Sequence, residues 1–346
     1  MENLGYEINE ALQNCEEMKR FSGVIKVAAE DSIVYEKSMG FADRSHEIVN
    51  DLETSFGIAS GAKLFTAVAI LKLVQDKKIR FEDKLKDILD IELPNISEKV
   101  TIHHLLTHTS GIEDYFDESN DEDFASSFKG IASYNLRKLK DFLPLIQNNK
   151  MKFQPGDRVC YNNGGYLFLG LIIEAVTGKT FHEYVDRKIL KPCRLNQTGY
   201  FELDALPHNV ANGYIDEEST RTWKSNIFSI PAKGGPDGGI FVTANELMKF
   251  WDILLEGNFL QEELVDRMLS PQVRMNQLIE YGYGVYILRE NNEAKKYFIT
   301  GMDPGVSFRY SYYPENGFKI VILGNSEFDD YEINEAIVSA LKEFGK

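Results

Sequence analysis

The sequence has 346 residues, of which 43% are hydrophobic and 27% are charged, the balance of an ordinary globular protein. Its formal net charge of −16 would repel nucleic acid phosphates and anionic membranes, so we expect neither as a partner. The three cysteines are widely spaced and form no C-x-x-C pair, which argues against a disulfide framework and against a zinc site. We expect the protein to use no metal and no cofactor.

Residues 1–21 are polar and acidic, without the basic start and the apolar run of a signal peptide. No apolar stretch approaches the length of a membrane span. As the sequence stands, we expect a cytoplasmic protein that is monomeric or weakly oligomeric. If a leader was removed, the expected location is outside the cytoplasm.

The first part of the chain predicts a helix, two strands and a second helix. Residues 4–19 are amphipathic at helical spacing, and residues 21–43 are rich in Val and Ile around a turn at residues 30–32. The second helix should be buried, since its apolar residues recur at helical spacing: Leu64, Val68, Leu71, Leu73 and Val74.

Helices dominate the middle of the chain. Residues 85–112 read as short helices, and residues 114–128 read as an acidic surface loop. Gly178 separates two further helices. The next helix begins after Thr243, which we expect to be its N-cap in a capping box with Glu246.

The C-terminal part of the chain predicts strands instead of helices. Four apolar or alternating runs within residues 281–325 predict antiparallel strands, and residues 332–344 predict a closing helix. The simplest α+β assembly is one antiparallel sheet made from both chain ends and flanked by the terminal helices, with a large, mostly helical insertion. We place the sheet domain at residues 1–58 and 276–346 and the helical domain at residues 59–275.

A serine and a lysine three residues apart, Ser60 and Lys63, stand at the start of the buried helix. Residues at this spacing share a helix face, and the helix dipole would favour a developing alkoxide on the serine. Desolvation loosens the proton of the lysine, which can then act as a general base. The same spacing recurs at residues 126/129 and 339/342, and a capping serine beside a solvated lysine is the alternative.

Tyr161 and Asn163 form the only Y-x-N of the sequence, after a turn that would present them on a loop. A lysine cation stabilises a phenolate, so Tyr161 needs Lys63 for chemistry. Asn163 offers its amide to a substrate carbonyl or to Lys63. Packing of the tyrosine on a loop and a turn role for the asparagine are the alternatives.

A predicted strand ends at Thr300 and Gly301, before a tight turn. Gly301 would let a substrate backbone lie close to the strand edge. The amide of Met302, facing the amide of Ser60, would cradle an oxyanion. An ordinary strand end is the alternative.

Taken in this order, the three segments resemble the motifs of the serine β-lactamase and penicillin-binding protein family. The likeness is closest to its class C branch, which includes D,D-peptidases, D-aminopeptidases and esterases, and it covers residues 23–325. Matching stretches include FGIASGAKLFTA, VTIHHLLTHTSGI, FQPGDRVCYNNGGYLFLGLIIEAVTG, GGIFVTANELMKFWDILLEG and IVILGN. The resemblance implies a β-lactamase/transpeptidase-like fold with the active site between the two domains.

The resemblance also implies a role for individual residues. Ser60 matches the acylated nucleophile, Lys63 its paired lysine and Tyr161 the catalytic tyrosine. Asn163 matches the asparagine of the same motif, and the two oxyanion amides would be those of Ser60 and Met302.

The third motif departs from the family pattern. The family usually carries lysine or histidine before the Thr/Ser-Gly pair, where this sequence has Ile299. That departure argues against turnover of β-lactams and against recognition of a C-terminal carboxylate. We expect Thr300 and Gly301 to contact the substrate, and Arg309 on the following strand is a candidate to replace the charge.

These observations predict a metal-independent serine hydrolase that acts through an acyl-enzyme on a peptide amide or a small ester. An active class C-type β-lactamase is one alternative. A non-catalytic homologue that binds a peptide or a peptidoglycan fragment is another, which Ile299 favours and the complete set of Ser60, Lys63 and Tyr161 opposes.

Overall fold

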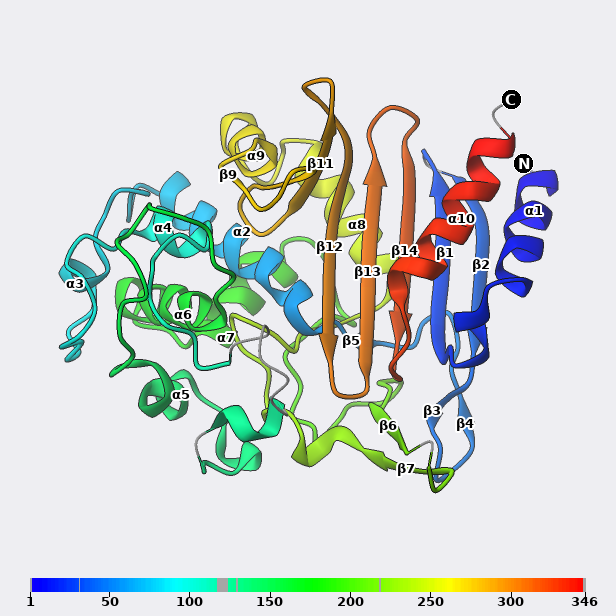
Figure 1. Ribbon diagram of the computed structural model, residues 1–346, viewed down its shortest axis with the longest axis horizontal. Helices are drawn as coiled ribbons and strands as arrows, with labels where there is room; N and C mark the ends of the chain where they lie inside the picture. The colour runs from blue at the N-terminus through cyan, green and yellow to red at the C-terminus, as the bar shows by residue number, and fades with distance from the viewer. Residues whose placement is uncertain (1, 31, 117–123, 129, 218, 345–346) are drawn as a thin grey trace.

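The computed structural model of the protein describes residues 2–30, 32–116, 124–128, 130–217 and 219–344. Its centre is an antiparallel sheet of eight strands (Figure 1). Their order across the sheet is β2 (Ser32–Met39), β1 (Gly23–Ala29), β14 (Phe318–Gly324), β13 (Val306–Tyr313), β12 (Glu293–Asp303), β11 (Tyr286–Glu290), β10 (Ile279–Tyr281) and β9 (Val273–Arg274). Strands β1 and β14 are neighbours in this order and pair along their whole length, so the predicted α+β class, with a sheet built from both chain ends, is confirmed.

Strands β1 and β14 show why this sheet is buried on both faces. Alternate side chains of a strand point to opposite faces. On β14, Ile320 and Ile322 enter one hydrophobic cluster, and Val321 and Leu323 enter the other. The first cluster lies under α1 (Glu2–Gln13) and α10 (Asp330–Phe344), which cover one face of the sheet side by side (Figure 1). The second cluster joins the opposite face to the helical part of the chain.

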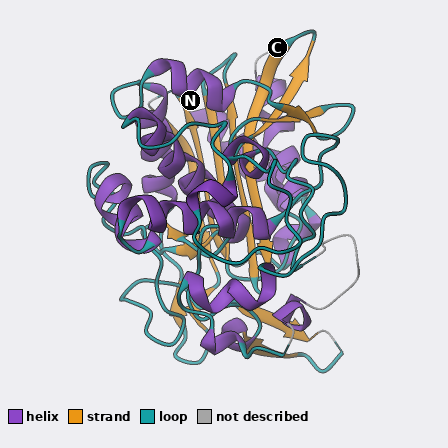
Figure 2. Ribbon diagram, turned by 90° about the vertical axis from the view of Figure 1, so that its left-hand side faces the viewer, coloured by secondary structure: helices purple, strands orange, loops and turns teal. Residues whose placement is uncertain are grey.

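The helical part packs against that opposite face (Figure 2). Its helices are α2 (Ala62–Gln75), α3 (Leu85–Ile88), α4 (Ile102–Leu106), α5 (Leu139–Ile146), α6 (Asn163–Thr177), α7 (Phe181–Val185), α8 (Ala244–Leu255) and α9 (Glu262–Leu269). Helix α2 is buried along most of its length, as its apolar sequence predicts. Burial on all sides holds its N-terminus in one place, at the junction with the sheet.

Three two-stranded ribbons complete the fold. They pair β3 (Phe41–Asp43) with β4 (Ile48–Val49), β5 (Phe56–Gly57) with β8 (Phe241–Val242), and β6 (Tyr214–Glu217) with β7 (Thr222–Ser225). Strand β5 leads directly into the Ser60 turn, so its pairing with β8 fixes where that turn begins.

Several predicted boundaries differ from the structure. The first helix ends at Gln13, and a short 3₁₀ helix, Glu16–Lys19, follows it. Thr243 caps α8 as predicted, but the Glu246 carboxylate accepts from the amides of residues 196 and 197 instead of closing a capping box. Residues 117–123 of the predicted acidic loop lie outside the described residues. The division of the chain into domains at residues 58/59 and 275/276 stays a prediction.

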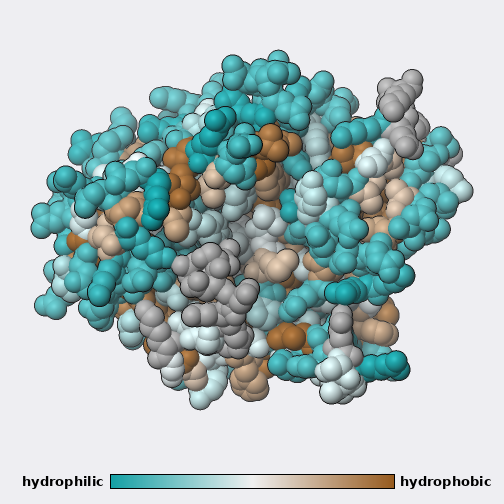
Figure 3. Space-filling model, viewed as in Figure 1, coloured by the Kyte–Doolittle hydropathy of each residue, from teal (hydrophilic) through white to brown (hydrophobic). Residues whose placement is uncertain are grey.

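The visible face of the molecule is mostly hydrophilic, with apolar side chains in small groups (Figure 3). Within the described residues, every helix is too short or too polar to cross a bilayer.

Candidate active site

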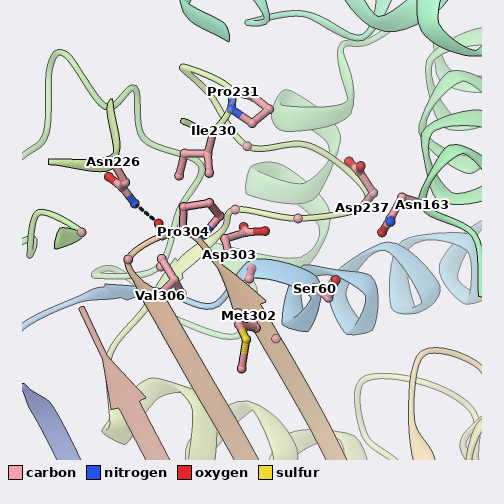
Figure 4. A pocket seen from close by; sticks show the side chains of 18 of the residues that line it. Ser60, Asn163, Asn226, Ile230, Pro231, Asp237, Met302, Asp303, Pro304 and Val306 are labelled. Carbon is pink, nitrogen blue, oxygen red and sulfur yellow. Dashed lines mark hydrogen bonds between the residues drawn. The ribbon is translucent and has the colours of Figure 1, made fainter. Parts of the chain in front are cut away.

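A cavity of about 580 Å³ lies where the end of β12 meets the N-termini of α2 and α6. Ser60, Tyr161 and Asn163 line it from the helical part, and residues 300–302 line it from the sheet. Figure 4 shows Ser60, Asn163 and Met302 around this space, each from a different element. The fold therefore brings the three sequence segments singled out by their motifs to one place.

Ser60 stands in a sharp turn between β5 and α2. The residue before it, Ala59, has a φ of +44°, a left-handed conformation that is unusual for a residue with a side chain. Two backbone hydrogen bonds hold this turn to the segment before β8: Ile58 N donates to Ile240 O, and Gly239 N donates to Ala59 O. The turn presents the Ser60 hydroxyl to the cavity at the N-terminal end of α2, where the helix dipole favours negative charge.

Lys63 lies beneath Ser60 and is 2% exposed. Its Nζ donates to Ser60 Oγ at 3.0 Å, to Asn163 Oδ1 at 2.8 Å and to the main-chain oxygen of Asp237 at 2.6 Å. Acceptors on several sides suit the protons of an ammonium group. The arrangement therefore suits a charged lysine that holds the serine hydroxyl in position. The expected partners of Asn163 were Lys63 and a substrate carbonyl, and its side-chain oxygen accepts from Lys63.

The carbonyl of Asp237 is a contact that the sequence motifs did not indicate. It belongs to the segment GGPDGG, in which Gly235 N donates to Gly238 O and closes a tight turn. Thr66, one turn after Lys63 on α2, donates to the Pro236 oxygen at 2.7 Å. Successive carbonyls of this turn thus face α2, and its glycine-rich sequence is the signal that could have indicated a close backbone approach.

Tyr161 lines the cavity, and the Lys63 ammonium lies 4.8 Å from the centre of its ring. The loop around this tyrosine is held by His108, which has a φ of +58°. The His108 oxygen accepts from Cys160 N at 2.8 Å, its Nδ1 accepts from Asn162 N at 3.1 Å, and its ring lies 4.5 Å from the Tyr161 ring. One histidine therefore contacts three consecutive residues of the loop.

His108 is buried and stays neutral. Burial, and to a smaller extent the charge of Lys63, lowers its pKa well below the usual value. Because Nδ1 accepts a hydrogen bond, the proton belongs on Nε2, which has no hydrogen-bond partner among the described residues. No motif singled out His108, although it lies in one of the stretches that carry the resemblance.

Asp114 positions Asn163 at the start of α6. Its two carboxylate oxygens accept from Asn163 N at 2.6 Å and from Gly164 N at 2.8 Å, at the positive end of the helix. Burial raises the pKa of Asp114 to about 7, against the effect of these hydrogen bonds. No local pattern indicated this carboxylate, because Asn163 and Gly164 lie 49 and 50 residues away in the chain.

Gly301 lies against the Ser60 turn. A Cβ on this glycine would be 2.3 Å from Ile58 O and 2.8 Å from Ser60 N, so no side chain fits. The glycine thus allows β12 itself to approach the turn, and the expectation that it also lets a substrate backbone lie close to the strand stays a prediction. The next residue, Met302, is 64% exposed at the cavity.

Thr300 and Arg309 are directed to Asp330, on the α10 side of the sheet. Thr300 Oγ1 donates to Asp330 Oδ2 at 3.0 Å, and Arg309 Nε and Nη2 donate to Asp330 Oδ1 at 3.1 and 2.9 Å. Thr300 still lines the cavity, but Arg309 does not. Ile299 is 3% exposed and packs in the core. The structure therefore does not place Arg309 as a substitute for the missing cation of the third motif.

Comparisons with known proteins show which sequences and folds the chain resembles. Residues 8–342 match the family described as Beta-lactamase. Penicillin-binding protein 4* of Bacillus subtilis (strain 168) is 26% identical over 339 residues, which are 94% of this chain and 72% of that protein. A solved penicillin binding protein from Bacillus halodurans is 42% identical, with a TM-score of 0.89 over 96% of this chain and 99% of that chain. An octameric penicillin-binding protein homologue from Pyrococcus abyssi is 27% identical, with a TM-score of 0.80 over 99% of this chain and 77% of that chain.

Proposed function

The chain belongs to the serine β-lactamase and penicillin-binding protein family, and on this premise we propose that it is a hydrolase that cleaves small esters or peptide amides through an acyl-enzyme on Ser60. The observation that supports this most directly is the hydrogen bond from the buried Lys63 ammonium to Ser60 Oγ, at the base of the cavity. A cation that donates to the serine oxygen holds it in position and stabilises the negative charge that develops there as the proton leaves.

In the proposed acylation, Tyr161 is the base. The Lys63 cation beside its ring favours the phenolate, which accepts the proton as Ser60 Oγ attacks the carbonyl carbon. The amides of Ser60 and Met302 stabilise the oxyanion, a contribution of about 10²–10³-fold in kcat for each donor. When the tetrahedral intermediate collapses, the bond to the alcohol or amine breaks, and that leaving group takes the proton back from Tyr161.

Deacylation repeats these steps with water as the nucleophile. Tyr161 accepts a proton from the water, the Ser60 ester bond breaks, and Ser60 Oγ takes the proton back while the free acid leaves. Hydrogen bonding of Lys63 to Asn163 and to the Asp237 carbonyl keeps its charge beside the reacting groups in both halves of the cycle.

The experiment is a substrate panel of p-nitrophenyl esters, D-amino acid amides and a chromogenic cephalosporin, run with the wild type and with Ser60→Ala. We expect turnover of an ester or amide that is lost in the variant. If the wild type hydrolyses none of them and gives no Ser60 adduct with a fluorophosphonate, the proposal is wrong.

The two alternatives are weaker candidates. A β-lactam carries a carboxylate, and the described residues that line the cavity include no arginine or lysine that would hold it. A non-catalytic binding protein would not need Lys63, Tyr161 and Asn163 gathered around a serine hydroxyl.

A further inference from the structure

Two consecutive residues, Asp114 and Tyr115, bind two residues that accept from the Lys63 ammonium. The Asp114 carboxylate accepts from Asn163 N, and Asn163 Oδ1 accepts from Lys63 at 2.8 Å. The Tyr115 hydroxyl donates to Asp237 Oδ2 at 2.6 Å, and the main-chain oxygen of Asp237 accepts from Lys63, also at 2.6 Å. One short segment thus holds two acceptors that lie 100 and 174 residues from Lys63 in the sequence.

The pair of Tyr115 and Asp237 is buried, with exposed fractions of 7% and 8%. Burial raises the pKa of Tyr115 well above its usual value, and the charges of Asp237 and Asp114 add to this effect. The hydroxyl of Tyr115 therefore keeps its proton and acts as a donor, which leaves Tyr161 as the proposed base. Burial also raises the pKa of Asp237, whereas the Lys63 charge and the Tyr115 hydroxyl oppose that rise. Without this hydroxyl, a buried carboxylate would lose a donor, which is a costly change.

The side chain of Asp237 restricts the direction of its own carbonyl. That carbonyl belongs to the peptide unit between Asp237 and Gly238, and a glycine places the fewest limits on the rotation of such a unit. The hydrogen bond from Thr66 holds the Pro236 oxygen, which belongs to the preceding unit. The bond from Tyr115 holds the next part of the turn, because it fixes the Asp237 side chain.

We propose that Tyr115 is a positioning residue for the acylation of Ser60. Through its bond to Asp237 it keeps the Asp237 carbonyl on Lys63, and this carbonyl holds the ammonium in the direction from which it donates to the serine. Figure 4 shows the Asp237 and Asn163 side chains next to each other at the Ser60 end of the cavity. The inference rests on the proposed function, and it gives Tyr115 a role other than substrate contact or proton transfer.

Tyr115→Phe tests this with a small change, because it removes the hydroxyl and keeps the ring at the cavity. We expect the acylation burst with p-nitrophenyl butanoate and the labelling of Ser60 by a fluorophosphonate to slow by roughly 10–10²-fold, with little change in KM for the ester. The matched control is Tyr283→Phe, which removes another buried hydroxyl. That hydroxyl is bonded to His103 and lies outside the cavity, so the control should acylate like the wild type.

Two variants of Asp237 separate its position from its charge. Asp237→Asn loses the charge but keeps a side-chain oxygen that can accept from the Tyr115 hydroxyl, so its acylation rate should stay close to that of the wild type. Asp237→Ala has no acceptor and should be about as slow as Tyr115→Phe. Because these last two changes break the same hydrogen bond, the double variant should be no slower than the slower single variant.

Wild-type acylation in Tyr115→Phe, or a loss confined to KM, overturns the inference. Losses that multiply in the double variant also overturn it, because Tyr115 would then act independently of Asp237. If Asp237→Asn is as slow as Asp237→Ala, charge and not position is what this residue supplies, and the inference is wrong. If Asp237→Ala does not fold, the comparison of Tyr115→Phe with Tyr283→Phe and Asp237→Asn decides.

Each of these results leaves the proposed function standing as long as the wild type turns over the ester and forms the adduct on Ser60. Absence of any turnover in the wild type, with no fluorophosphonate adduct on Ser60, overturns both.

Discussion

The floor and the wall of the cavity are built in different ways. The floor consists of Ser60, Lys63, Asn163 and the Asp237 carbonyl, and short hydrogen bonds join them around a buried cation. The wall is the end of β12, residues 301–305, with partly or fully exposed side chains such as Met302 and Asp303. If the proposed function is correct, this difference teaches that the hydrogen-bonded floor sets the reaction type, whereas the more open wall is the part that contacts the substrate.

The largest effect should come from the floor. Ser60→Ala removes the nucleophile and should lower kcat for p-nitrophenyl butanoate by about 10³-fold or more. The matched control is Ser339→Ala, because Ser339 has the same spacing to a lysine but lies exposed on α10, where its hydroxyl donates to the Glu335 oxygen. Steady-state assays of both variants check this, and substantial activity in Ser60→Ala would show that the floor is not catalytic.

Removing the cation should have the next largest effect. Lys63→Met should slow acylation by about 10²–10⁴-fold, the range for loss of general-base catalysis, because without the cation Tyr161 no longer forms the phenolate that accepts the proton. It also leaves Asn163 Oδ1 without its lysine partner, which costs about 1–3 kcal/mol in the free energy of unfolding. Rapid-mixing measurement of the acylation burst, at a temperature where the variant is folded, separates the two effects. Lys72→Met on the same helix should acylate normally.

A smaller effect on kcat is expected from His108, which contacts the Tyr161 loop but does not line the cavity. His108→Ala should lower kcat by roughly 10–10²-fold with little change in KM, because a displacement of about 1 Å in a reacting group costs rate without removing binding contacts. His108→Asn should recover part of the loss, since its amide oxygen can accept from Asn162 N and asparagine tolerates a positive φ. Equal losses in both variants, or an effect confined to KM, would contradict a positioning role. Exposed His46 provides the control substitution.

The mildest effect should be a change in the pH dependence of stability at Asp114. Burial raises its pKa to about 7 in the folded protein, whereas the unfolded value is about 3.9. The folded chain therefore binds this proton more tightly, and the resulting stabilisation is complete below about pH 4 and is lost as the pH rises through about 7. Asp114→Asn removes this titration. Denaturant unfolding of both proteins should show the wild type losing stability relative to the variant across that window.

The sequence predicted the floor well because its chemistry is partly local. Ser60 and Lys63 are three residues apart on one helix face, and Tyr161 and Asn163 occur in one short motif. The continuous apolar run at residues 320–323 of β14 similarly predicts a strand that is buried on both faces. In each case the information lies within a few neighbouring residues.

The remaining parts depend on contacts between distant segments. His108 and Asn162, which are joined by a hydrogen bond in the Tyr161 loop, are 54 residues apart in the sequence. Lys63 and Asp237, whose carbonyl accepts from the Lys63 ammonium, are 174 residues apart. Arg309 pairs with Thr300 across β12 and β13, so the pairing of two consecutive predicted strands was enough to place it near the third motif. Its ion pair with Asp330 was not, because that depends on where α10 packs.

The central claim is that Ser60 becomes acylated on a floor activated by Lys63. The most direct test is to treat the protein with a fluorophosphonate and locate the adduct by mass spectrometry of its peptides. We predict one adduct, on Ser60, that is absent in Ser60→Ala and forms much more slowly in Lys63→Met. An adduct on another residue, or one that forms equally fast in Lys63→Met, would contradict the claim.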